Sequence, residues 1–286
     1  SVQLDPSYAP AWSALGTRWY NEYQYGNATV DRSQEATSRA AALDPDLDSA
    51  QRGIIVLKTE RGDLTGAYRA ARTLVTRRPE SGEAHFSLSY VLRYAGLNDE
   101  AARECDKAHA LDPTNPSFRS CAFVFLLIGD PRHGEQFANL DGESLWTRTY
   151  RGQALMHQNR LQEAAVALPD APPGFRARDV VTAVLQHRPQ GEIDRVSALA
   201  KASVLRVNDP EDSFFDAEVF AACGRTRDAL DLLQTMAARN FCAYPALDHV
   251  PAFNAFRNTP EFWQIRNDAI QCQQRFLQWR AANTRP

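Results

Sequence analysis

The sequence predicts an all-α solenoid, in which helical hairpins of one repeated type stack side by side. A repeat of 34 residues is typical of such a helix–turn–helix unit. Glycine tolerates the positive φ that ends a first helix, alanine lets two helices approach closely, and proline ends a second helix. These three residue types recur at a spacing of 34: Gly62 and Gly96, Ala67 and Ala101, and Pro45, Pro79 and Pro113.

The elements follow this hairpin pattern along the chain. Helix pairs are expected at 11–23 with 33–43, 49–61 with 64–77, and 82–95 with 98–110. A fourth pair opens at Pro116 and has a short second helix near 132–140, and a fifth covers 142–157 and the segment from Asn159. Later pairs are expected at 175–187 with 192–207 and at 212–223 with 227–239, before a closing helix at 261–281. Polar positions on this last helix predict a capping element: Gln264, Asn267, Gln271, Gln274 and Gln278.

The proline-rich segment 168–174 is the clearest interruption, and we interpret it as a hinge or subdomain boundary. Residues 1–168 are predicted to form an N-terminal array of about four to five helix pairs. Residues 169–286 are predicted to hold divergent pairs and the capping helix, continuous with the first array. Because the core of a solenoid is linear, each hairpin is expected to pack only on its neighbours.

The first hairpin carries a more specific signature. Trp12, Leu15, Gly16 and Trp19 resemble the pattern W-x2-L-G-x2-Y of the tetratricopeptide repeat (TPR) family, with tryptophan in place of the final tyrosine. The resemblance implies a right-handed solenoid whose first helices line a concave groove that binds another protein. Segment 244–262 resembles the ends of repeat regions in bacterial multidomain regulators, which implies that the chain is part of one. The lysine–asparagine clamp of the family's best-known peptide groove has no match here.

Composition and charge exclude several classes of function. The net charge of −3, from 32 basic and 35 acidic residues, argues against binding to nucleic-acid phosphates, which needs a basic excess. No apolar run approaches the roughly 18–20 residues that span a bilayer. The longest run, 121–128, is interpreted as a buried first helix. We therefore expect neither a nucleic-acid partner nor membrane insertion of this segment.

The cysteines give a prediction about the compartment. The chain has five, at irregular spacings that match neither a C-x-x-C motif nor a zinc ribbon. Cys105 and Cys121 fall where a small apolar side chain is needed, so they are interpreted as buried free thiols. Free thiols favour a reducing compartment such as the cytoplasm, with the periplasm as the alternative.

The sequence nominates no catalytic, metal or cofactor site. It contains no phosphate-binding loop, dinucleotide fingerprint, zinc-protease helix or nucleophile elbow. The six histidines show no ligand spacing, and the carboxylates are dispersed. An enzyme is therefore not expected, since it would need an acid and a base that only the fold could bring together.

Helical geometry predicts which side chains face the groove. If Trp12, Leu15 and Trp19 pack between helices, the residues one position further along face the partner. The third hairpin then offers two tyrosines and an arginine within about one turn, a combination typical of binding hot spots. The alternative is that Phe86 and Tyr90 pack the helix of the next hairpin and that Arg93 is solvated. The predicted partner-binding residues are Tyr20, Asn21, Arg52, Phe86, Tyr90, Arg93, Tyr94, Trp146, Met156 and His157.

Two classes of function follow. The first is a non-catalytic protein–protein interaction scaffold, which holds a peptide or a helix of another protein in the concave groove and belongs to a larger bacterial regulator. The second is a sensor domain for a small molecule or peptide, enclosed by the aromatic groove or by the proline-rich segment 169–173. The fold alone does not separate the two classes, because it carries many binding surfaces.

Overall fold

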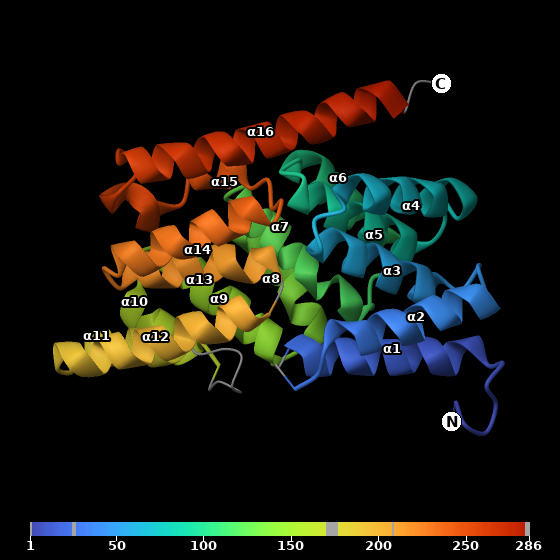
Figure 1. Ribbon diagram of the computed structural model, residues 1–286, viewed down its shortest axis with the longest axis horizontal. Coiled ribbons are helices and arrows are strands. Elements are labelled where there is room, and N and C mark those ends of the chain that lie inside the picture. The colour runs from blue at the N-terminus through green and yellow to red at the C-terminus, as the bar shows by residue number, and fades with distance from the viewer. Residues whose placement is uncertain (1, 25–26, 170–176, 208, 284–286) are drawn as a thin grey trace.

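The computed structural model describes residues 2–24, 27–169, 177–207 and 209–283, and within these ranges every regular element is helical. The predicted all-α helical solenoid is confirmed. Most of the helices form consecutive hairpins (Figure 1). The first five hairpins are α1 (Ala9–Gln24) with α2 (Val30–Leu43), α3 (Asp48–Glu60) with α4 (Leu64–Arg77), α5 (Gly82–Tyr94) with α6 (Asn98–Leu111), α7 (Cys121–Leu127) with α8 (Pro131–Ala138), and α9 (Leu145–His157) with α10 (Leu161–Ala167).

The second half of the chain continues the same pattern. Its hairpins are α11 (Ala177–Leu185) with α12 (Gln190–Arg206) and α13 (Pro210–Ala222) with α14 (Thr226–Ala238), followed by the short α15 (Tyr244–Leu247) and the long α16 (Pro260–Asn283). Short 3₁₀ turns cover Pro116–Ser120, Asn139–Asp141 and Pro251–Ala255. The second helix of the fourth hairpin, α8, is short, as predicted. Most of the predicted hinge at 168–174 lies outside the described residues. None of the described helices is both long and apolar enough to cross a bilayer.

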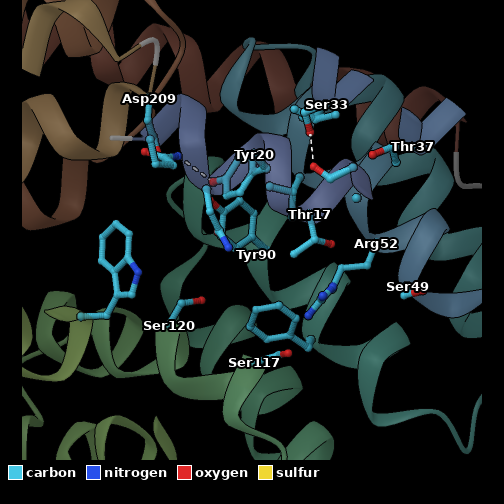
Figure 2. Close-up of a pocket in the computed structure, with 18 of the residues that line it drawn as sticks. Thr17, Tyr20, Ser33, Thr37, Ser49, Arg52, Tyr90, Ser117, Ser120 and Asp209 are labelled. Atoms are coloured by element: carbon cyan, nitrogen blue, oxygen red, sulfur yellow. Dashed lines mark hydrogen bonds between the residues drawn. The ribbon is translucent and has the colours of Figure 1, made fainter. Parts of the chain in front are cut away.

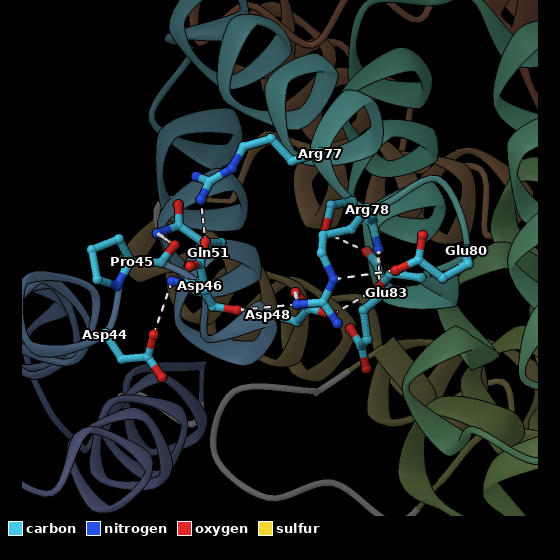
Figure 3. A network of polar contacts seen from close by, with 12 residues as sticks. Asp44, Pro45, Asp46, Asp48, Gln51, Arg77, Arg78, Glu80 and Glu83 are labelled. Carbon is cyan, nitrogen blue, oxygen red and sulfur yellow. Dashed lines mark hydrogen bonds and ion pairs between the residues drawn. The ribbon is translucent and has the colours of Figure 1, made fainter.

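Polar side chains connect the loops that join successive hairpins (Figure 3). The Asp44 carboxylate accepts from the Asp46 backbone N–H at 2.9 Å, which closes the Asp-Pro turn before α3. Arg77, at the end of α4, pairs with Asp46, and the Arg78 guanidinium donates to Asp48 at 3.2 Å. These partly exposed contacts add little stability individually. Their effect is to hold the start of α3 against the start of the following hairpin.

The repeated glycines occupy turns that the second half of the chain contacts closely. Gly62 and Gly96 have φ values of +80° and +72°, which glycine adopts without strain. The Cys242 backbone N–H donates to the Tyr94 carbonyl at 2.8 Å, so the loop after α14 lies directly on the turn that contains Gly96. A Cβ atom on Gly96 would overlap the Cys242 carbonyl oxygen. The spacing of 34 therefore marks helix ends that also receive a distant segment.

Gly96→Ala is expected to destabilise the chain more than Gly224→Ala. Both glycines have φ near +70°, but nothing lies within 4 Å of a Cβ on Gly224. Backbone strain alone should cost about 1–2 kcal/mol, and the overlap at Gly96 should add about 1–2 kcal/mol more. Urea unfolding of both variants measures this difference, and equal midpoints would contradict the close approach.

The last helix turns back over earlier hairpins. In Figure 1, α16 runs across α14 and also across the α4–α6 region. Gln273 donates to the Gly96 carbonyl at 2.9 Å, and both nitrogens of the Arg280 fork contact the Glu100 carboxylate at 2.9 and 3.1 Å. The expectation that each hairpin packs only on its neighbours is therefore wrong. The helix has two faces: the five predicted polar positions are exposed, as expected, while Phe262, Ile265, Ala269, Cys272 and Phe276 are buried.

The interpretation of Cys105 and Cys121 as free thiols is wrong. They form a disulfide between α6 and the start of α7, with Cα atoms 5.9 Å apart. A second disulfide joins Cys242, after α14, to Cys272 in α16. Cys223 is free and buried. Sequence spacing did not reveal these pairs because each one joins parts of different hairpins or of the closing segment. The argument for a reducing compartment therefore loses its basis.

Candidate functional site

A cavity of about 280 Å³ lies where the first helices of several hairpins converge. Side chains from α1, α3, α5, α9 and the start of α13 line it. Thr17 and Asn21 on α1 are exposed and form part of its mouth, whereas Gln24, one turn further along, is 3% exposed. Figure 2 shows Tyr20 and Tyr90 close together, between Asp209 on one side and Arg52 on the other. The cavity therefore runs from solvent into the interior.

A chain of hydroxyl and carboxyl groups crosses one wall of the cavity. Tyr20 and Tyr90 both donate to the same Glu60 oxygen, at 2.5 and 2.9 Å. Tyr94 continues the line, because its hydroxyl lies 3.1 Å from that of Tyr90 and donates to Asp209 at 2.7 Å. Glu60 and Asp209 are about 95% buried, so neutral tyrosines satisfy two carboxyl groups that have left water. This wall joins the end of α3, α5 and the cap of α13.

Arg93 and Glu211 form the principal ion pair of the interior. The Arg93 Nε and one terminal nitrogen lie 2.8 and 2.9 Å from the two oxygens of Glu211, and the other terminal nitrogen donates to the Ser120 carbonyl at 2.5 Å. Arg93 is 1% exposed. The predicted alternative, a solvated Arg93, is therefore wrong. A bidentate pair of this kind fixes the position of α13 against α5.

Three arginines line the cavity, and each has an acidic partner. Besides the Arg93 pair, Arg52 lies 3.3 Å from Glu83, and Arg119 lies 3.0 Å from Asp141. Asp212, in the first turn of α13, also lines the cavity, but no hydrogen bond or ion pair of its carboxylate occurs within the described residues. The charged groups nearest to it are other carboxyls. Asp212 is therefore the cavity-lining carboxylate that the described side chains leave without a hydrogen bond or ion pair.

Seven of the ten predicted partner-binding residues line this cavity: Tyr20, Asn21, Arg52, Phe86, Tyr90, Arg93 and Trp146. The other three do not. Tyr94 is fully buried behind Tyr90, and Met156 is 4% exposed. His157 contacts Glu218 of α13 at 3.0 Å, away from the cavity. One turn of α5 thus has both a lining face and a core face, which the simple offset from Trp12 did not distinguish. Binding by any of these residues stays a prediction.

Sequence reasoning missed the acidic side of the cavity. Glu60, Asp209 and Asp212 come from α3 and from α13, which are about 150 residues apart in the chain. A carboxylate at the start of a helix usually indicates a cap, and Asp209 does accept from the Glu211 backbone N–H at 2.9 Å. A signal was present in the three acidic residues among positions 209–212, because a helix cap needs only one of them. Within the described residues, no group of three or more histidine, cysteine or acidic side chains is placed to hold a metal ion.

Several carboxyl groups near the start of α13 have raised pKa values. Burial raises the pKa of Asp216 to about 7. Burial, together with the charge of Asp209, raises the pKa of Glu60 and that of Asp212 as well. Folding therefore favours the protonated forms of these groups.

The thermal stability of the chain is expected to fall as the pH rises from about 5 to about 8. A carboxyl with a raised folded pKa binds its proton more tightly in the folded chain, so its contribution is complete below the unfolded pKa and is lost as the pH rises through the folded pKa. Asp216→Asn should reduce the change in unfolding free energy across this pH range by about 1–2 kcal/mol. This is less than the raised pKa of Asp216 would give for a fully buried group, because Asp216 is only partly buried. Melting temperatures of both proteins across this range test it; a wild-type melting temperature that rises with pH would contradict it.

No protein-family model matches the chain, and no curated protein matches it by sequence. Among solved structures it is similar to Naa15/Naa10 bound to HypK-THB, with 14% identity, a TM-score of 0.38, and coverage of 97% of this chain and 42% of that one. It is also similar to yeast Tom70, with 12% identity, a TM-score of 0.41, and coverage of 96% and 57%. It is similar as well to the TPR domain of P58(IPK), with 13% identity, a TM-score of 0.26, and coverage of 99% of this chain and 92% of that one. The chain spans less than two thirds of the length of the first two, and the function proposed below rests on its own cavity.

Proposed function

We propose that the chain is a non-catalytic protein-interaction scaffold that holds a segment of another polypeptide at the mouth of the cavity between α1, α3, α5 and α13. The observation that carries the proposal is the convergence of seven predicted partner-binding residues on this one cavity. Aromatic rings beside arginine are enriched at binding hot spots, and here they lie next to exposed residues of α1. Membership of a larger bacterial regulator stays a prediction from the resemblance of segment 244–262.

The carboxyl cluster does not favour an enzyme. Three of its carboxyl groups already have partners. Glu60 accepts hydrogen bonds from Tyr20 and Tyr90, Asp209 accepts one from Tyr94, and Glu211 is paired with Arg93. Within the described residues, Asp212 makes no hydrogen bond to a serine or another nucleophile of the cavity lining. Binding is the better supported role. The second candidate, a small-molecule sensor, is favoured by the cavity volume of about 280 Å³, which is close to the lower limit for small-ligand pockets.

Peptide display against the wild-type chain tests the scaffold. We expect it to select peptides whose affinity falls about tenfold or more for Trp146→Ala, because Trp146 lines the cavity. Trp263→Ala is the matched control, since Trp263 lies on α16 and is 48% exposed. Equal loss in both variants, or selection of no peptide, would contradict the scaffold. A metabolite that raises the melting temperature when no peptide binds would favour the sensor.

A further inference from the structure

Carboxyl groups outnumber cationic groups among the side chains that line the cavity and those bonded directly to them. Its three arginines are each paired with an acidic residue, as described above. Three further carboxyl groups remain, those of Glu60, Asp209 and Asp212. Tyrosine hydroxyls satisfy the first two as neutral hydrogen-bond donors, so they leave the negative charge in place when these groups ionise. An anionic ligand would be repelled here, and a cationic one would be attracted.

Asp212 is the acceptor that remains available. Asp209 caps α13, and Glu211 holds Arg93, but the Asp212 carboxylate has no such role within the described part of the chain. It lines the cavity and is partly exposed, so a ligand can reach it. Burial and the neighbouring carboxyl groups raise the pKa of Asp212 in the empty cavity, and a cationic group placed beside it would lower that pKa and favour the ionised form.

A second, independent acceptor lies in the same cavity. The Gln24 side chain is 3% exposed, and its amide nitrogen donates to the Tyr20 hydroxyl at 2.7 Å. Tyr20 already donates its proton to Glu60, so this orientation of the Gln24 amide is fixed by the network. Among the described residues, the Gln24 oxygen has no hydrogen-bond partner. A buried amide oxygen without a partner is uncommon, and a ligand with N–H groups would satisfy it.

The remaining lining suits the apolar stem of a basic side chain. Phe86, Phe123 and Trp146 line the cavity together with Tyr20. Aromatic faces attract cations, and the cavity lining already contains two such contacts: the Arg119 guanidinium carbon lies 5.9 Å from the Trp146 ring centre, and that of Arg93 lies 4.7 Å from the Tyr90 ring centre. Lysine and arginine bury their methylene groups against apolar surfaces and keep the charged end at polar groups. A volume of about 280 Å³ admits one such side chain but not a helix.

We propose that this cavity receives one basic side chain, of arginine or lysine, from the partner polypeptide, with its charged end directed toward Asp212 and Gln24. The proposal rests on the proposed scaffold function and specifies its ligand.

Calorimetric titration with short capped peptides tests the charge. The probes are Ac-Gly-Arg-Gly-amide, Ac-Gly-Lys-Gly-amide and Ac-Gly-citrulline-Gly-amide; citrulline has nearly the shape of arginine without its charge. We expect the basic peptides to bind at least about tenfold more tightly than the citrulline peptide. Asp212→Asn should remove this preference. Asp216→Asn is the matched control: it changes the same residue type one turn further along α13, outside the lining, and should preserve the preference.

Each other outcome overturns the proposal. Equal binding of the arginine and citrulline peptides to the wild-type chain would overturn it. This comparison needs no variant, so it does not depend on whether Asp212→Asn folds. An unchanged preference in a folded Asp212→Asn variant would exclude Asp212. Binding of agmatine as tightly as the peptides would make the ligand a free small cation. No binding by any basic probe at about 10 mM would exclude the basic side chain. Peptides selected by display without a basic residue would leave the scaffold function intact and overturn only this inference.

Discussion

Glu211→Ala is expected to lower the free energy of unfolding by about 3–5 kcal/mol. The change leaves the Arg93 guanidinium buried, 1% exposed, and without its ion-pair partner, while the Ser120 carbonyl and the Tyr90 ring still contact it. Desolvation of a charge without its partner is among the largest costs that a single substitution can cause. Burial raises the pKa of Glu211 to about 7, although Arg93 opposes that rise, so unfolding is best measured at pH above this value, where the pair is ionised. Urea unfolding followed by circular dichroism gives the difference.

The double variant Arg93→Met with Glu211→Leu separates the ion pair from packing. Because both charges are removed, no uncompensated charge is left, and the double variant should be more stable than Glu211→Ala. Arg77→Ala is the control for an exposed pair: its partner Asp46 has a side chain 68% exposed, and its loss should cost less than about 1 kcal/mol. A Glu211→Ala variant as stable as the Arg77→Ala variant would show that α13 is not held by this pair.

The local structure of the chain could be predicted because it follows from residues close in sequence. The glycines and prolines at a spacing of 34 gave the hairpins, and the polar positions of 261–281 gave the exposed face of α16. The rest depended on contacts between distant residues. Nothing near Arg93 indicates that Glu211, 118 residues later, will neutralise it. Tyr94 was predicted to face the partner for the same reason, because its acceptor, Asp209, lies 115 residues away.

The cysteines show the same limit at the level of a single bond. Cys242 and Cys272 are 30 residues apart, and they meet only because α16 turns back over the loop after α14. A sequence pattern for a disulfide requires a regular framework of spacings, which five irregular cysteines do not provide. The pairing of Cys242 with Cys272 therefore depends on the position of α16, and neither could be inferred from the sequence without the other.

Removal of the Cys242–Cys272 bond is expected to lower the free energy of unfolding by about 3–4 kcal/mol, because the bond closes a loop of 30 residues in the unfolded chain. Cys242→Ala with Cys272→Ala should also weaken the contact between Gln273 and Gly96, since the bond holds α16 beside the turn that contains Gly96. Urea midpoints of this variant and of the wild type, each with and without reductant, give the effect. Cys223→Ala is the control and should respond to reductant as the wild type does, because Cys223 is unbonded.

Thiol labelling of the denatured, unreduced chain decides whether the bonds form at all. One reactive thiol among the five cysteines is expected. Five reactive thiols would contradict both disulfides and restore the free-thiol interpretation.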